Sequence, residues 1–172
     1  MDDIVMFNEC SLDDAKIIGK KAAYISELYS KGFNVLNGLV ITGNLFVKFI
    51  EMTQLKERVA EILVNNDDIE KKSLQIQQMI LNTPFPEDMA KFIYNAYLKL
   101  DEHEMPQEPY IALRVSSTSD YVEDAFFLNI KGKDRFINGI KSCWASVFTP
   151  KNLPLKRFKP SIIVQVMASP IK

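Results

Sequence analysis

A single arginine lies between an apolar run and a series of hydroxyl side chains in IALRVSSTSDYVEDAFFLNI, residues 111–130. Arg114 is separated by Val115 alone from the hydroxyl run Ser116, Ser117, Thr118 and Ser119. A guanidinium and several hydroxyls can together donate hydrogen bonds to a phosphate, so this spacing is that of an anion site. The alternative is an ordinary exit from a strand, in which Arg114 pairs with Asp120 or Asp124.

Other residues with catalytic potential give weaker signals. Asp120, Glu123 and Asp124 carry the oxygen ligands that Mg²⁺ prefers, but three acids in a polar loop are more often solvated. His103, the only histidine, lies in the polar stretch DEHEMPQEP between predicted elements. Nucleophilic catalysis by a serine–histidine or cysteine–histidine pair therefore has little support.

The composition is that of an ordinary globular chain. Its 172 residues are 47% hydrophobic and 25% charged, which suits one domain, residues 1–172, with a full core. A net charge of −1 without a basic stripe argues against a nucleic-acid partner. The apolar runs are too short to span a bilayer, and the acidic start MDDIVMF is unlike a signal peptide. We expect a cytoplasmic protein without a membrane partner, in which Cys10 and Cys143 are reduced thiols.

Hydrophobic periodicity predicts an α+β fold. The predicted strands are 4–7, 35–42 with a turn signal at Asn37-Gly38, 110–115, 126–130 and 161–167. Helices are predicted over 21–31, ending at an αL Gly32, over 44–52 and 133–148, and in three amphipathic segments between Leu55 and Leu100, one capped by Asp67 or Asp68. Short apolar strands need cover, so we expect the last four strands to form one mainly antiparallel sheet covered by helices, with Trp144 buried.

Three groups of motifs, in this order, resemble one family. IGKKAAYISELYSKGFNVLNGLVITGNLFVKFIE, residues 18–51, resembles the start of the ATP-binding domain shared by phosphoenolpyruvate synthase, pyruvate phosphate dikinase and rifampicin phosphotransferase. ALRVSSTSDYVEDA, residues 112–125, resembles the family's AVRSSATAEDLPDA. NIKGKDRFINGIKSCWASVFT, residues 129–149, and SIIVQVM, residues 161–167, resemble the two motifs that follow.

The resemblance implies an ATP-grasp-like fold, of which this chain is the first subdomain. It also implies that Lys21 and Arg114 reach ATP phosphates, with Lys20 as an adjacent candidate for the lysine. Ser116 and Thr118, in the hydroxyl run, complete the expected ATP site. Mg²⁺ is expected to be supplied or completed by a partner.

The departures from the family pattern concern the phosphate lid and the second half of the fold. The family continues after LPDA with a segment like SFAGQQDTFLN, whereas here Ala125 runs directly into Phe126. No glycine occurs between Gly43 and Gly132, so the loop after Arg114 is not a glycine-rich cradle. The acidic and glutamine residues of the second subdomain and the phosphocarrier histidine do not occur either.

Two functions follow from this comparison. In the first, the chain is the nucleotide-binding half of a split phosphotransferase, completed by a separately encoded partner that carries the second subdomain and the histidine. In the second, it is a degenerate, non-catalytic binding or regulatory module. In either case we expect no kinase or ATPase turnover by the isolated chain, because it offers only the cations that phosphoryl transfer requires.

Overall fold

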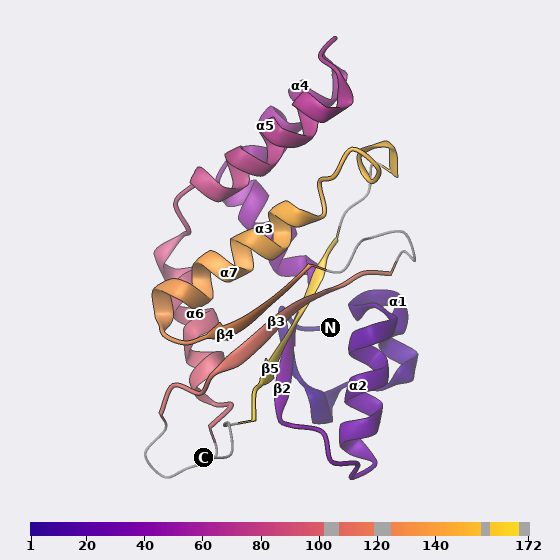
Figure 1. Ribbon diagram of the computed structural model, residues 1–172, viewed down its shortest axis with the longest axis vertical. Coiled ribbons are helices and arrows are strands. Elements are labelled where there is room, and N and C mark those ends of the chain that lie inside the picture. The colour runs from indigo at the N-terminus through magenta and orange to yellow at the C-terminus, as the bar shows by residue number, and fades with distance from the viewer. Residues whose placement is uncertain (102–106, 119–124, 156–158, 169–172) are drawn as a thin grey trace.

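The computed structural model describes residues 1–101, 107–118, 125–155 and 159–168. This part of the chain contains a five-stranded sheet in the order β1-β2-β5-β3-β4, with every neighbouring pair antiparallel (Figure 1). Its strands are β1 (Ile4–Met6), β2 (Gly38–Ile41), β3 (Ile111–Ser116), β4 (Phe126–Ile130) and β5 (Ser161–Val166). The expected mainly antiparallel sheet is confirmed, and β1 adds one edge strand to it.

Helices cover both faces of this sheet. They are α1 (Ala15–Ile18), α2 (Lys20–Ser30), α3 (Gly43–Met52), α4 (Leu55–Val64), α5 (Ile69–Asn82), α6 (Glu87–Leu98) and α7 (Lys133–Ser146), with 3-10 turns η1 (Phe7–Glu9), η2 (Leu12–Asp14) and η3 (Leu153–Leu155). The large core lies between one face of the sheet and α3 to α7. A smaller core lies on the other face, where α2 packs with η1. Among the described residues, no helix combines the length and the hydropathy that crossing a membrane requires.

Aromatic side chains fill the centre of the large core. Trp144 of α7 is fully buried, as predicted, and its ring stacks on Phe85 with centroids 5.7 Å apart. Gly139 lets α7 approach the sheet, because a Cβ at this position would lie 2.5 Å from a methyl group of Leu113. The projecting α4–α5 hairpin extends beyond the sheet, and Asp68 caps α5 by accepting a hydrogen bond from the Lys71 N–H at 2.7 Å (Figure 1).

The element boundaries differ from the sequence predictions at a few points. The strand predicted over 35–42 spans only Gly38–Ile41, and residues 35–37 form neither a strand nor the predicted turn. The Asn37 side chain accepts a hydrogen bond from the Gly38 N–H at 2.8 Å. The helix predicted over 133–148 ends at Ser146. The strand predicted over 126–130 has the same bounds in the structure, and Gly32 has the expected positive φ of 76°.

Candidate functional site

The start of α2 and the end of β3 are in direct contact, although they are far apart in the sequence. The backbone N–H of Ala22 donates a hydrogen bond of 3.1 Å to the hydroxyl of Ser116, 94 residues later. Gly19, just before α2, has φ +85°, and a Cβ on it would lie 2.5 Å from Ser116 Oγ and 2.7 Å from the Ser117 carbonyl oxygen. Only glycine fits this junction without rearrangement. The fold thus joins IGKK to the strand that carries Arg114.

A second serine makes the matching contact from the neighbouring strand. Ser161 of β5 is the cross-strand partner of Ser116. Its hydroxyl accepts a hydrogen bond from the Gly43 N–H, at 3.2 Å, and donates one to the Ile17 carbonyl oxygen, at 3.4 Å. Both serines are buried. As a result α2 and α3 begin at the same end of the sheet, where the partial positive charge of a helix start favours anions.

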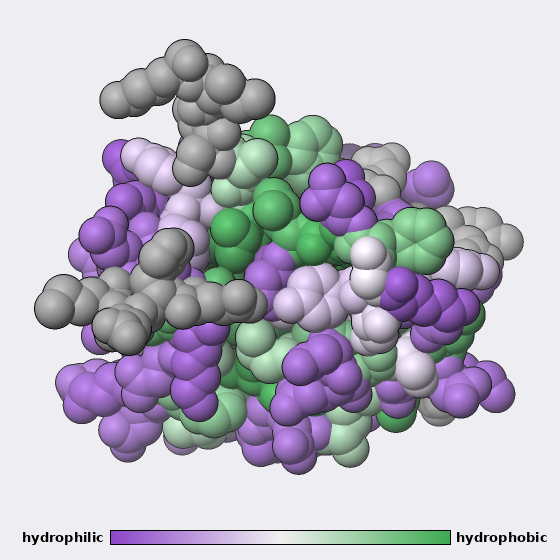
Figure 2. All heavy atoms as spheres, turned by 90° about the horizontal axis from the view of Figure 1, so that it is seen from below, coloured by the Kyte–Doolittle hydropathy of each residue, from purple (hydrophilic) through white to green (hydrophobic). Residues whose placement is uncertain are grey.

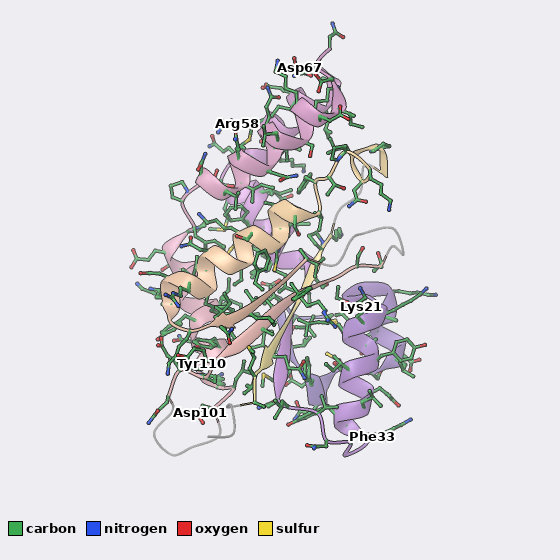
Figure 3. The ribbon with its side chains drawn as sticks, viewed as in Figure 1. Lys21, Phe33, Arg58, Asp67, Asp101 and Tyr110 are labelled. Atoms are coloured by element: carbon green, nitrogen blue, oxygen red, sulfur yellow. The ribbon has the colours of Figure 1, made fainter. Side chains whose placement is uncertain are left out.

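The candidate cations lie around this junction. Lys20 and Lys21 are exposed in the first turn of α2, and Figure 3 places Lys21 at the end of that helix opposite Phe33. Arg114 is exposed on β3 and is paired with Ile163, whose side chain packs in the small core beneath α2. Cross-strand partners point to the same face of a sheet, so Arg114 lies on the face that α2 covers in part.

The other predicted site residues differ in their exposure and in whether the structure describes them. The Ser116 hydroxyl is buried and bonded to α2, so here it holds the helix start. Thr118 is exposed two residues beyond β3. The possible Arg114 partners Asp120 and Asp124, together with Glu123 and His103, lie outside the described residues. A shared ligand for Lys21 and Arg114 stays a prediction, since the structure establishes only that their backbone segments adjoin.

Most of this junction, including Gly19, Ala22 and Ser116, lies in a stretch of the chain that matches a known protein family. Residues 15–159 match the family model described as pyruvate phosphate dikinase, AMP/ATP-binding domain. The chain belongs to this family.

Curated relatives of this dikinase-family chain are phosphoenolpyruvate synthases. The enzyme of Helicobacter pylori is 35% identical over 164 residues, covering 86% of this chain and 20% of the relative. The probable enzyme of Staphylothermus marinus is 30% identical over 188 residues, covering 96% of this chain and 22% of the relative. That of Escherichia coli is 27% identical over 164 residues, covering 86% and 20%. This dikinase-family chain therefore spans about a fifth of these relatives' length.

Several residues that shape the dikinase-family junction were not predicted from the sequence to do so. Gly19 and Gly43 stand immediately before or at the start of a helix, and Ser161 begins a strand. A glycine before a helix is a recognisable signal, but its tight contact with Ser116 is not local information. Ser161 gives no sequence signal, because its partners Gly43 and Ile17 come from two other elements.

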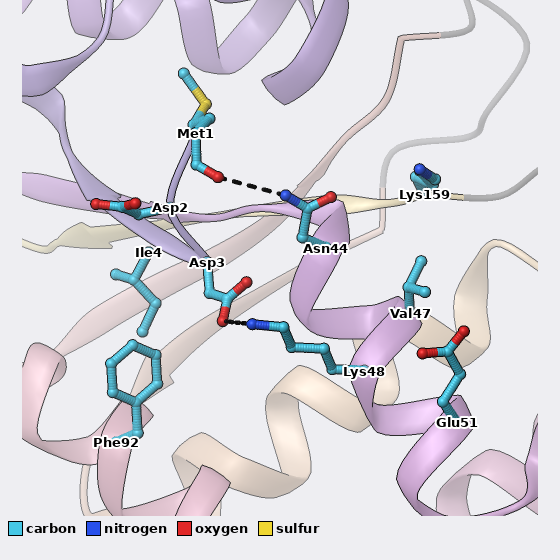
Figure 4. Close-up of a pocket in the computed structure, with 10 residues that line it drawn as sticks. All are labelled: Met1, Asp2, Asp3, Ile4, Asn44, Val47, Lys48, Glu51, Phe92 and Lys159. Carbon is cyan, nitrogen blue, oxygen red and sulfur yellow. Dashed lines mark hydrogen bonds and ion pairs between the residues drawn. The ribbon is translucent and has the colours of Figure 1, made fainter.

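An open groove of about 730 Å³ lies elsewhere on this dikinase-family domain, between β1 and α3 (Figure 4). Lys48 forms an ion pair with Asp3 at 2.5 Å there, and the Asn44 amide donates to the Met1 carbonyl oxygen at 3.4 Å. The groove carries charges of both signs, with Glu51 and Lys159 on its walls. It borders the β1 edge of the sheet, whereas Arg114 lies near the opposite edge. It is not the predicted phosphate site.

The described residues were also compared with the ligand sets that bind metal ions. Among the residues that the structure describes, no three His, Cys, Asp or Glu side chains gather as a cation site would require. The acidic run Asp120, Glu123 and Asp124 is outside that set, so the prediction for Mg²⁺ stays untested there.

Proposed function

We propose that this dikinase-family chain is an ATP-binding module in which the phosphates are held where α2 meets β3. The contact of Gly19 and Ala22 with Ser116 carries this proposal, because it joins the lysine-bearing and arginine-bearing motifs. Lys21 and Arg114 are the proposed phosphate ligands. Lys20 and Thr118 are secondary ligands, and Ser116 fixes the start of α2.

The residues present fit a polyphosphate. Gly19 keeps the backbone free of a side chain beside the helix start, where N–H groups favour an anion. A lysine neutralises charge as a compact point, and an arginine binds two phosphate oxygens in a fixed geometry. Bound ATP brings a transferable phosphoryl group, and the chain's cations would orient it and offset its charge.

The remainder of the site is proposed to lie on polypeptide outside these 172 residues. The chain has no glycine between Gly43 and Gly132 with which to close a loop over phosphates, and its relatives are about five times longer. A second wall, carrying the ligands that complete Mg²⁺ binding, would exclude water and strengthen each charged contact. We therefore infer that the isolated chain binds ATP weakly and has no turnover.

A second candidate is a non-catalytic module that has lost ATP binding. It is favoured by the absent phosphate loop and by Lys20, which stands where the family pattern has glycine. This scaffold would serve as a binding or regulatory surface.

Calorimetric titration with Mg-ATP separates the two functions. If the site is functional, Lys21→Ala and Arg114→Ala each weaken binding about 10- to 100-fold, the effect of losing a charged hydrogen bond to phosphate. Lys56→Ala and Arg58→Ala remove the same charges from the exposed α4 and leave binding unchanged. Figure 3 places Arg58 on the projecting hairpin, far from Lys21.

The titration of the unaltered chain tests whether the chain binds ATP at all. No heat of binding at millimolar ATP would favour the non-catalytic module over the ATP-binding one. An equal loss in the α4 variants would show nonspecific attraction to cations and overturn the assigned site. Turnover by the pure chain would contradict the need for a second wall.

A further inference from the structure

The two edges of the sheet differ in how they are protected. The β1 edge is three residues long and is preceded by Asp2 and Asp3, and short charged edges resist pairing with other strands. The β4 edge is five residues long, and its sequence FFLNI contains no charged residue or proline. No strand in the described part of the chain pairs with its outer side.

The backbone groups on that outer side can be assigned from the β3–β4 hydrogen bonds. Val115 donates its N–H to the Ala125 carbonyl oxygen at 3.2 Å, and Leu113 is the partner of Phe127. Bonding alternates along an antiparallel strand, so the N–H and C=O groups of Phe126 and Leu128 point away from β3. Asn129, with φ +57°, interrupts the ladder beyond them.

Two apolar side chains accompany these outward-facing backbone groups. Phe126 and Leu128 are 57% and 52% exposed. Phe126 is the cross-strand partner of Arg114, so both apolar side chains lie on the sheet face that α2 leaves partly open. Viewed from the lower end of the molecule, apolar side chains extend from the middle of the surface to its upper edge, between hydrophilic side chains (Figure 2). Exposed apolar residues on an open strand edge are typical of an interaction surface.

We propose that β4 pairs antiparallel with β4 of a second copy of this chain, about a two-fold axis through Phe127. In this register Phe126 faces Leu128 of the other copy, and each such pair exchanges both backbone N–H···O bonds. The exposed apolar side chains then cover one another, and no charge meets a like charge. The segment is complementary to itself, as a two-fold interface requires.

Pairing of one β4 with another also limits the assembly to two copies, because both β4 edges are then used. A pairing of β4 with the β1 edge of another copy would leave one open edge at each end and bring Asp2 and Asp3 beside the apolar pair. The β4–β4 contact is small, so the dimer is weak and forms with rising concentration. This inference does not depend on ATP binding.

Sedimentation velocity over a concentration series tests the dimer. The mass should rise from 19.7 kDa towards about twice that value in the unaltered chain. Phe126→Lys and Leu128→Glu should each abolish the rise, since a charge on the edge opposes pairing. Leu74→Lys, at a 55% exposed apolar position on α5, is the matched control and should dimerise normally.

Mixing the two β4 variants, Phe126→Lys and Leu128→Glu, tests the register. In the mixed pair the introduced lysine of one copy would face the introduced glutamate of the other, so the mixture should regain the dimer that neither variant forms alone. Emission from the buried Trp144, equal to that of the unaltered chain, shows that each variant is folded. A chain that stays monomeric at all concentrations would overturn the proposal, as would a dimer that is insensitive to both β4 substitutions.

Discussion

The hydroxyl of Ser116 accepts a hydrogen bond from the backbone N–H of Ala22 at 3.1 Å and thereby ties the start of α2 to the end of β3. The N–H groups in the first turn of a helix have no partner within the helix, so this bond satisfies one of them inside the protein. Because Ser116 is only 1% exposed, water cannot readily take the place of its hydroxyl as the acceptor for the Ala22 N–H. The same contact sets the position of Lys21, the next residue towards the N-terminus, relative to Arg114.

Replacement of Ser116 by alanine is expected to lower the free energy of unfolding by about 1 to 2 kcal/mol, the usual effect of losing a helix-capping hydroxyl whose partner stays buried. Urea denaturation measures this change. Ser142→Ala is the control, because the Ser142 hydroxyl bonds only to a carbonyl oxygen of its own helix, that of Asn138. Equal effects of the two substitutions would contradict a special role for the α2–β3 bond.

Gly19→Ala and Gly32→Ala separate backbone strain from steric contact. Both glycines have positive φ, +85° and +76°, so each substitution should cost about 1 to 2 kcal/mol of stability through backbone conformation. A Cβ at Gly32 meets nothing within 4 Å, whereas one at Gly19 meets Ser116 and Ser117 below 3 Å. Gly19→Ala should therefore destabilise by a further 1 to 3 kcal/mol, about the cost of overpacking.

The measurement for the glycine pair is again the urea midpoint, with the slope of the transition checked for constancy. If Gly19→Ala were no more harmful than Gly32→Ala, the close approach between α2 and β3 would be wrong.

Tyr97 predicts a pH dependence. Burial raises the pKa of its phenol to about 12, against the opposing effect of the Gly132 backbone, and its hydroxyl donates to the Pro109 carbonyl oxygen at 2.7 Å. Below pH 10 the phenol is protonated in both states. Between about pH 10 and 12 the unfolded chain releases the proton and the folded chain does not, so stability falls as pH rises.

Tyr97→Phe removes this ionisation together with the hydrogen bond. The variant should be less stable than the unaltered chain at pH 8, by about 1 kcal/mol. Between pH 10 and 12 the difference should shrink and then change sign, because the ionisation changes it by at most about 2 kcal/mol in total. Urea denaturation across this range gives the comparison, in which other ionising groups cancel. A constant difference would mean that Tyr97 titrates normally.

Both cysteines are expected to be protected from thiol reagents. Burial raises the pKa of Cys143 to about 12, and burial with the charge of Asp14 raises the pKa of Cys10 to about 11. Only the thiolate reacts, so in the folded chain at pH 8 both should modify at least about 100-fold more slowly than in urea. Dithionitrobenzoate absorbance measures the rates, and the variants Cys10→Ala and Cys143→Ala assign them. A fast native reaction would place that thiol at the surface.

Local patterns in the sequence were sufficient to predict most of the helices and strands. The apolar run of β4 was predicted with its observed bounds, and the spacing of apolar residues on α7 predicted the burial of Trp144. These features depend on neighbours within a few residues, so they can be read along the chain. The motifs around Lys21 and Arg114 likewise indicated the family before any geometry was known, and the family match over residues 15–159 confirmed it.

The sequence by itself therefore determined the α+β class, the apolar faces and the family, whereas only the tertiary structure decided which segments meet. Nothing near Ser116 indicates that its partner is Ala22, or that β5 enters the sheet between β2 and β3. Strand order and register depend on packing between distant residues, whose energies are not written in local periodicity. For the same reason the sequence marked Arg114 and Lys21 separately, while the fold placed the strand of one against the helix of the other.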